Sequence, residues 1–242
     1  MNFKKRCFVI LVFATTLATG SASATCSKAS LSGVWGVWAG ATVAQFSADG
    51  KGNITNGSFT ASQSGTIVTQ TFTGTYSIAT NCTGSLTLNI TGGGTITASI
   101  VLDQMNKGLQ IIFTTSGQTG AGLGVAEGTV TCGLTGKKAT FATLLFGKIS
   151  STSTHVEYVF QAILDGHGHV SGSGTFDVGG TIHKGSITGS TYTENSNCTG
   201  TLHIVPPGLS ALNFDFVVVN SGNELLAVET DTGTGVGGFI EQ

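Results

Sequence analysis

Tyr76-Ser-Ile-Ala-Thr-Asn-Cys-Thr-Gly-Ser-Leu86 returns 116 residues later as Tyr192-Thr-Glu-Asn-Ser-Asn-Cys-Thr-Gly-Thr-Leu202. Six of the eleven positions are identical, namely Tyr, Asn, Cys, Thr, Gly and Leu. The same offset carries Asp49-Gly-Lys-Gly52 onto Asp165-Gly-His-Gly168. Because two separate motifs share one offset, the sequence predicts a duplicated module.

The first residues of the chain, 1–24, have the pattern of a signal peptide. Three cationic residues at positions 4–6 precede an apolar run over 8–17, and Ala22-Ser-Ala24 matches a small-residue cleavage site. The apolar run has ten residues, whereas a membrane-spanning helix needs roughly 20. We therefore expect a bacterial protein that is secreted or periplasmic, with a mature chain beginning near Thr25 and no membrane association.

The charge of the chain limits its partners. Charged residues make up only 9% of the sequence, against about a quarter in ordinary globular domains. Without residues 1–24, seven lysines face twelve carboxylates, so the net charge is −5 and no arginine remains. Nucleic-acid sites need clustered cations, with arginine as the usual bidentate donor. The composition therefore argues against a nucleic-acid partner.

Cysteine placement follows the duplication. Beyond residue 24 each copy opens with Thr-Cys and carries a second cysteine in the repeated motif, at Cys26, Cys82, Cys132 and Cys198. Four cysteines allow three pairings, and the duplication favours Cys26–Cys82 and Cys132–Cys198. No C-x-x-C or Cys–His spacing supports a zinc site instead. We therefore predict two domains, 25–130 and 131–242, each with one structural disulfide.

Alternation of apolar and polar residues predicts strands throughout. It runs over 69–78, 86–90 and 96–102 in the first copy and over 156–160 and 214–218 in the second, without a helical period. Turn signals recur about every ten residues, which divides the first copy into about eight strands. Eight antiparallel strands can close into a barrel with room for one small ligand. The predicted fold is all-β, with two tandem antiparallel barrels.

Two resemblances accompany this pattern. Gly33-Val34-Trp35 is similar to the G-x-W at the start of lipocalins and related calycin barrels, in which the tryptophan plugs the closed end. The second copy has no G-x-W. The Tyr…Asn-Cys-Thr-Gly-x-Leu motif, with Asp-Gly-x-Gly upstream, resembles a family of uncharacterised secreted bacterial β-proteins over nearly all the mature chain. The first resemblance implies a ligand-binding barrel, whereas the second implies no activity.

The function that we expect is therefore binding of a small apolar ligand inside a barrel, without a cofactor. Aromatic residues on the alternating strands are the candidate ligand-binding residues: Trp35, Trp38, Phe72, Tyr76, Tyr158, Phe160 and Tyr192. An alternative is a structural or adhesive surface protein that binds a glycan through the threonine ladder at 69, 71, 73 and 75. A third hypothesis is an outer-membrane barrel, against which the lack of aromatic girdles argues.

The sequence offers little for catalysis, and no catalytic residue is predicted. Glu127 and Glu241 both lie near the last strand of a copy, where a carboxylate inside a barrel would be a candidate acid or base. An outward position on the strand explains them more simply. Asp49 and Asp165 are expected to cap hairpin turns, because D-G-x-G is a turn sequence.

The candidate metal ligands are histidines of the second copy, together with Asp165. His167 and His169 flank a glycine in a predicted turn, and His183 follows in the same copy. No spacing signature supports a metal site, so we expect these residues to be exposed hairpin residues and predict no metal.

Overall fold

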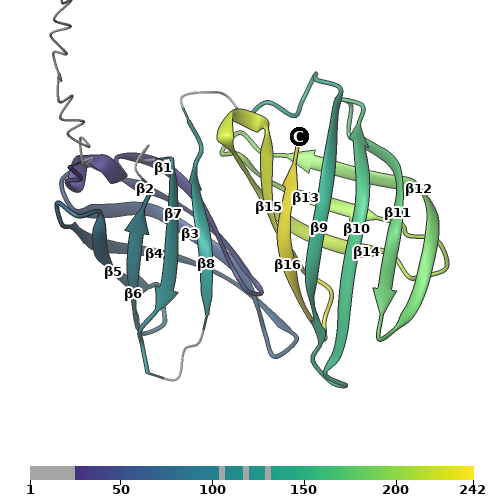
Figure 1. The fold of residues 1–242 in the computed structure, drawn as a ribbon, viewed down its shortest axis with the longest axis horizontal. Coiled ribbons are helices and arrows are strands. Elements are labelled where there is room, and N and C mark those ends of the chain that lie inside the picture. The colour runs from purple at the N-terminus through teal and green to yellow at the C-terminus, as the bar shows by residue number, and fades with distance from the viewer. Residues whose placement is uncertain (1–24, 104–106, 117–119, 129–131) are drawn as a thin grey trace, which may run out of the picture.

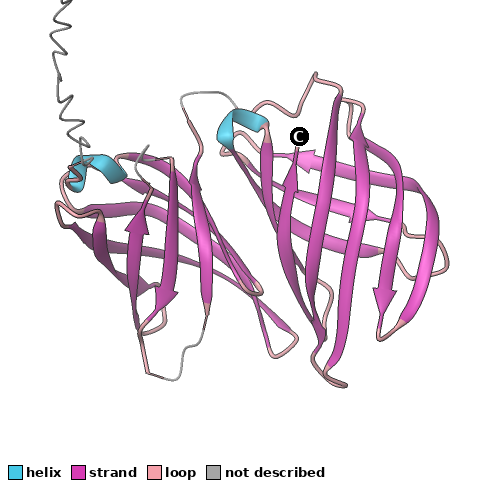
Figure 2. Ribbon diagram, viewed as in Figure 1, coloured by secondary structure: helices cyan, strands magenta, loops and turns pink. Residues whose placement is uncertain are grey.

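A computed structural model describes residues 25–103, 107–116, 120–128 and 132–242, and it is all-β. Sixteen strands form two closed antiparallel barrels of eight strands each, which lie side by side (Figure 1). Two short 3-10 turns are the only helical elements among the described residues (Figure 2). The predicted fold class is therefore confirmed. The predicted signal peptide and the predicted boundary at 130/131 lie outside the described residues.

The strands follow one another around each barrel in chain order. The first barrel contains η1 (Lys28–Leu31), β1 (Gly33–Ala39), β2 (Thr42–Ala48), β3 (Asn53–Gln63), β4 (Thr66–Ile78), β5 (Thr83–Ile90), β6 (Thr95–Leu102), β7 (Gly108–Phe113) and β8 (Ala121–Ala126). The second contains β9 (Ala139–Ile149), β10 (Thr154–Leu164), β11 (His169–Val178), β12 (Thr181–Glu194), β13 (Thr199–Ile204), β14 (Leu212–Val219), η2 (Asn220–Gly222), β15 (Glu224–Glu229) and β16 (Thr234–Glu241). Pairing of β1 with β8 and of β9 with β16 closes the barrels. No helix among the described residues is long and apolar enough to cross a membrane.

The two repeated motifs meet in space in both barrels. The Tyr76 N–H donates to the carbonyl of Gly52 at 2.9 Å, and the Tyr192 N–H donates to Gly168 at the same distance. Each Asp-Gly-x-Gly segment is a turn whose aspartate accepts backbone N–H groups: Asp49 Oδ1 accepts from residues 51, 52 and 53 at 2.7–2.9 Å. Each motif thus contributes one side of a contact that is the same in both copies.

The Asn-Cys-Thr-Gly turn has the same geometry in both barrels. Asn81 Oδ1 accepts the Thr83 hydroxyl at 2.8 Å, and Asn197 Oδ1 accepts the Thr199 hydroxyl at 2.7 Å. The cysteine between them has a left-handed backbone, with φ of 68° at position 82 and 64° at position 198. The turn places this sulfur for the predicted disulfides Cys26–Cys82 and Cys132–Cys198, which are both confirmed.

The glycine of the motif is required by a close backbone approach. A Cβ on Gly84 would lie 2.2 Å from the Ser77 carbonyl, and one on Gly200 would lie 2.1 Å from the Thr193 carbonyl. Any side chain here would push the two strands of the hairpin apart, so only glycine permits the pairing.

Tyrosine hydroxyls help to close one end of each barrel. The Tyr76 hydroxyl donates to the Lys28 carbonyl at 3.0 Å, and Trp35 Nε1 donates to the carbonyl of the fully buried Leu31 at 2.9 Å. These contacts hold η1 across the first barrel. In the second barrel the Tyr192 hydroxyl donates to the carbonyl of the buried Leu134 at 3.3 Å. In both barrels the end that carries the disulfide is therefore the plugged end.

The barrels pack against each other through an apolar cluster, here called the junction. Its members point outward from both barrels and are almost fully buried: Trp38, Val43, Val217, Val219, Leu226 and Val228. The backbones approach so closely that a Cβ on Gly36 would lie 2.4 Å from Val219 Cγ1. Hydrogen bonds flank the cluster, including Thr60 to Asp215 at 2.8 Å and the Gly233 N–H to the Gly65 carbonyl at 2.7 Å. Burial of this surface holds the two barrels in one arrangement.

Peptide mapping of the non-reduced protein should recover Cys26–Cys82 and Cys132–Cys198 cross-linked peptides. Each bridge spans a long loop, with separations of 56 and 66 residues, so its removal should cost about 4 kcal/mol of unfolding free energy. Chemical denaturation of Cys132→Ser/Cys198→Ser measures that loss. A peptide joining Cys82 to Cys132 would contradict the observed pairing.

Candidate functional site

A cavity of about 590 Å³ opens into the first barrel at the end away from η1. Its wall is mainly aliphatic and aromatic: Val37, Ala39, Ala41, Ala44, Phe46, Phe59, Ala61, Phe72, Leu86, Leu88, Ile90, Ile96, Ile111 and Phe113. Polar lining residues are few, namely Thr42, Ser62, Gln63 and Lys148. The volume and the apolar wall are typical of sites for small organic molecules.

Side-chain size at matching positions explains why this half of the barrel is hollow. The two barrels can be aligned by their strand pairing. Thr42 pairs with Ala61 in the first barrel, and Tyr158 pairs with Phe176 in the second. Tyr158 lies 116 residues after Thr42, and Phe176 lies 115 residues after Ala61. By the same alignment Ala44, which lines the cavity, matches Phe160. In the second barrel the two phenylalanine rings stack with centroids 5.4 Å apart. Two methyl groups, at positions 44 and 61, therefore stand where the second barrel has two rings, whereas the ring of Phe59 beside Ala44 stands where the second barrel has Gly174.

Further rings and many aliphatic side chains fill the rest of the second barrel's interior. Tyr158 packs on Phe176 at 5.6 Å between centroids, and Phe214 is 1% exposed. Phe214 matches Ala98 of the first barrel, because Phe214 pairs with Leu202 and Ala98 pairs with the equivalent Leu86. Large side chains at these inward positions produce a packed core.

Of the seven predicted ligand-binding aromatics, only Phe72 lines the cavity. Trp35 and Tyr76 lie at the plugged end, and Trp38 lies in the junction with its Nε1 buried and without a hydrogen-bond partner. The other three belong to the core of the second barrel: Tyr158, Phe160 and Tyr192. Aromatic character alone was a poor guide, because rings fill barrels as well as line cavities.

The residues that sequence reasoning missed are small ones. Nothing in the local sequence marks Ala44 or Ala61 as cavity residues. The 116-residue offset, however, aligns Ala44 with Phe160 of the second copy. A large residue in one copy against a small one in the other was a signal for a cavity. Lys148 carried no such signal, because it reaches this cavity from the other barrel.

A carboxyl group is buried inside the second barrel. Glu229 is 1% exposed, and its Oε2 has no hydrogen-bond partner among the described residues. Burial, together with the negative charge of Asp231, raises the pKa of Glu229 to about 8. Burial and then the charge of Glu229 also raise the pKa of Tyr158. At neutral pH the Glu229 carboxyl is therefore largely protonated inside an apolar core.

A polar cleft of about 780 Å³ lies on the outside, where the first barrel meets the Ser196–Cys198 turn of the second. Hydroxyl and amide groups line it, including Asn56, Ser58, Thr71, Thr73, Thr91 and Asn197. Two members of the predicted threonine ladder thus border it, and Thr71 donates to Thr91 at 2.9 Å. The cleft suits a ligand with many hydroxyl groups.

The two glutamates considered for catalysis have different surroundings. Glu127 lines the polar cleft, where Gln45 Nε2 donates to its Oε1 at 2.5 Å. Burial raises the pKa of Glu127, and the hydrogen bond from Gln45 opposes that shift. Glu241 is exposed at the end of β16 beside Glu224, whose pKa is raised to about 6 by burial and then by the Glu241 charge. The two glutamates thus interact with different groups, Glu127 with Gln45 and Glu241 with Glu224.

The histidines do not converge on a metal site. Among the described residues no group of three His, Cys, Asp or Glu side chains could hold a metal ion. His167 and His169 donate their backbone N–H groups to Asp165 Oδ1 at 2.7 and 3.0 Å, which also lowers the pKa of this aspartate. Asp165 therefore caps the turn as predicted, whereas His183 lies on β12 opposite Phe176.

Glu229 should make the protein less stable as the pH rises from 5 to 8. Its carboxyl ionises near 4.5 in the unfolded chain and near a pKa of 8 in the folded one, so the folded state binds the extra proton and loses this advantage as the pH rises. Glu229→Gln should flatten the dependence of the urea midpoint on pH. The exposed Glu157→Gln variant is the control and should keep the wild-type slope. Equal slopes in all three proteins would contradict the assignment.

Comparison of the chain with protein-family models, with curated proteins and with solved structures returned no match. The chemistry of the cavity and of the cleft is therefore the basis on which a function is argued.

Proposed function

We propose that this protein is a non-catalytic binding protein that takes one small apolar ligand into the first barrel. The observation that carries the proposal is the apolar cavity of about 590 Å³ beside Ala44 and Ala61. An apolar ligand would replace water on this wall, which is favourable in proportion to the area covered. No acidic side chain or histidine is among the described residues that line it, so binding is better supported than reaction.

The second barrel acts in this proposal as a packed support rather than as a second site. Its matching positions hold Phe160 and Phe176 instead of alanine. The lipocalin-like interpretation is supported by Trp35, which lies at the plugged end of the first barrel as the G-x-W resemblance implies. Two disulfides support a location outside the cytoplasm, in the secreted or periplasmic fraction, because such bridges persist in oxidising compartments.

Filling the cavity should weaken binding. In Ala44→Phe/Ala61→Phe two rings would enter the cavity beside Phe59, so affinity for an environment-sensitive fluorescent lipid probe should fall at least about tenfold. Fluorescence titration measures the affinity, and circular dichroism with a thermal melt verifies folding.

The matched control for this experiment is Ala142→Phe, which adds a ring at an exposed position on β9. It should bind the probe as the wild type does. If the double variant folds and still binds the probe with unchanged affinity, the ligand does not enter this cavity. The single Ala44→Phe variant extends the test should the double variant be unstable.

A second candidate function is attachment to a surface glycan through the polar cleft. It is favoured by one specific observation. Thr69, Thr71, Thr73 and Thr75 are exposed along β4, and Thr71 and Thr73 line the cleft together with other hydroxyl and amide groups. Ladders of this kind present regularly spaced hydroxyl groups, which match those of a polysaccharide.

Thr71→Lys/Thr73→Lys should therefore weaken glycan or cell-surface attachment at least about tenfold, because the longer charged side chains block the cleft. Surface plasmon resonance on immobilised glycans measures the effect. Thr191→Lys/Thr193→Lys places the same charges on exposed positions of β12 in the other barrel and is the control. Equal attachment by both double variants would remove this candidate.

A further inference from the structure

The cavity of the first barrel has one charged residue among the described residues that line it, Lys148. This lysine belongs to β9 and therefore to the second barrel. The other polar lining residues, Thr42, Ser62 and Gln63, are uncharged and come from β2 and β3. The apolar wall is thus bordered by a single cation that the first barrel does not itself supply.

Hydrogen bonds between the barrels fix the strand that carries Lys148. Lys148 pairs with Gly235 on β16. Near that pair, the Ser62 hydroxyl of the first barrel donates to the Thr234 carbonyl. A Cβ on Gly235 would lie 3.7 Å from the cavity-lining Ala41, so β16 rests directly on the rim of the cavity.

The adjoining turns extend this contact. The Ser150 N–H donates to the Gly233 carbonyl at 2.7 Å, and the Gly233 N–H donates to the Gly65 carbonyl at the same distance. Gly65 lies at the tip of the β3–β4 hairpin, and a Cβ there would lie 2.6 Å from Gly233 Cα. The hairpin of one barrel and the turn of the other therefore hold the backbone of Lys148 beside the opening.

We propose that the ligand is a single-chain amphiphile with an anionic head, such as a long-chain carboxylate, whose tail enters the first barrel and whose head binds Lys148. This inference rests on the proposed function of the cavity and adds the chemical class of the ligand. A lysine can lie along an apolar rim while its ammonium group stays in water. Lys148 is itself exposed, which places its charge at the boundary where such a head group would remain hydrated.

The tail and the head of the ligand contribute differently to binding. Burial of the tail against the aliphatic and aromatic wall supplies most of the affinity. An exposed ion pair adds little affinity but distinguishes a charged head from a neutral one, and the pair weakens as salt screens it. The chain beyond residue 24 carries a net charge of −5, so a local cation is needed if an anion is to bind preferentially.

The test compares dodecanoate with dodecanol, which share a tail and differ in the charge of the head. Each is titrated against a neutral fluorescent probe bound to the full-length protein. The wild type should prefer the carboxylate by about two- to fivefold at low salt, with the preference lost at high salt. Lys148→Met should remove the preference without weakening the alcohol, and Lys148→Glu should reverse it.

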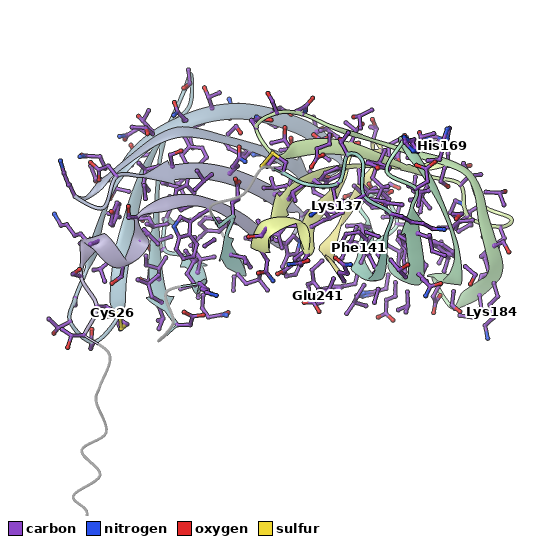
Figure 3. All side chains as sticks on the ribbon, turned by 90° about the horizontal axis from the view of Figure 1, so that it is seen from above. Cys26, Lys137, Phe141, His169, Lys184 and Glu241 are labelled. Atoms are coloured by element: carbon purple, nitrogen blue, oxygen red, sulfur yellow. A yellow bond between two sulfur atoms is a disulfide. The ribbon has the colours of Figure 1, made fainter. Side chains whose placement is uncertain are left out.

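Lys184→Met is the matched control, because it makes the same change in net charge. Lys184 is exposed on β12 and lies at the side of the second barrel farthest from the first (Figure 3), so this variant should keep the wild-type preference. Equal binding of both ligands by the wild type, or loss of the preference in Lys184→Met as well, would overturn the role of Lys148 and leave the apolar site standing. Failure of both ligands to displace the probe would overturn the proposed function itself.

Discussion

The interior of an eight-stranded barrel has a nearly fixed width, and the rest of this structure depends on what fills it. Such a barrel is just wide enough to be filled by side chains or to hold one small ligand. Both barrels here have eight strands in the same order, so strand number does not distinguish them. The distinction comes from side chains: alanine at 44 and 61 leaves space, whereas Phe160 and Phe176 stack in the corresponding space.

The junction joins the filled second barrel to the hollow first barrel. Its apolar residues, such as Trp38 and Val219, are buried between the barrels, and their burial makes separation costly. Because the barrels are held in one arrangement, a residue of the second can border the cavity of the first. Lys148 at the cavity and the Ser196–Cys198 turn at the polar cleft are both placed in this way. Neither the cavity rim nor the cleft belongs to one barrel alone.

The repeated motif lies at the opposite end from the cavity, so the contacts that stabilise each barrel are separate from the proposed binding site. The tyrosine, the Asp-Gly-x-Gly turn and the disulfide are linked to one another at the plugged end of each barrel, as the contact between Tyr76 and Gly52 illustrates. The open end of the first barrel is therefore free to carry different side chains without disturbing these contacts.

The sequence by itself determined the strand periodicity, the fold class and the disulfide pairing, because these depend on local patterns and on an offset that can be read along one chain. The sequence places Trp35 and Tyr76 on strands but wrongly predicts that they line the cavity, since periodicity tells which face a residue is on and not how far it lies from the open end. Only the tertiary structure decided which interior is hollow, because that depends on the volumes of side chains that meet across the barrel. Only the tertiary structure, too, decided that Lys148 borders the cavity and that Trp38 is buried in the junction. Both residues owe their surroundings to the docking of two barrels, and docking depends on the shapes of two surfaces that no spacing along the chain describes.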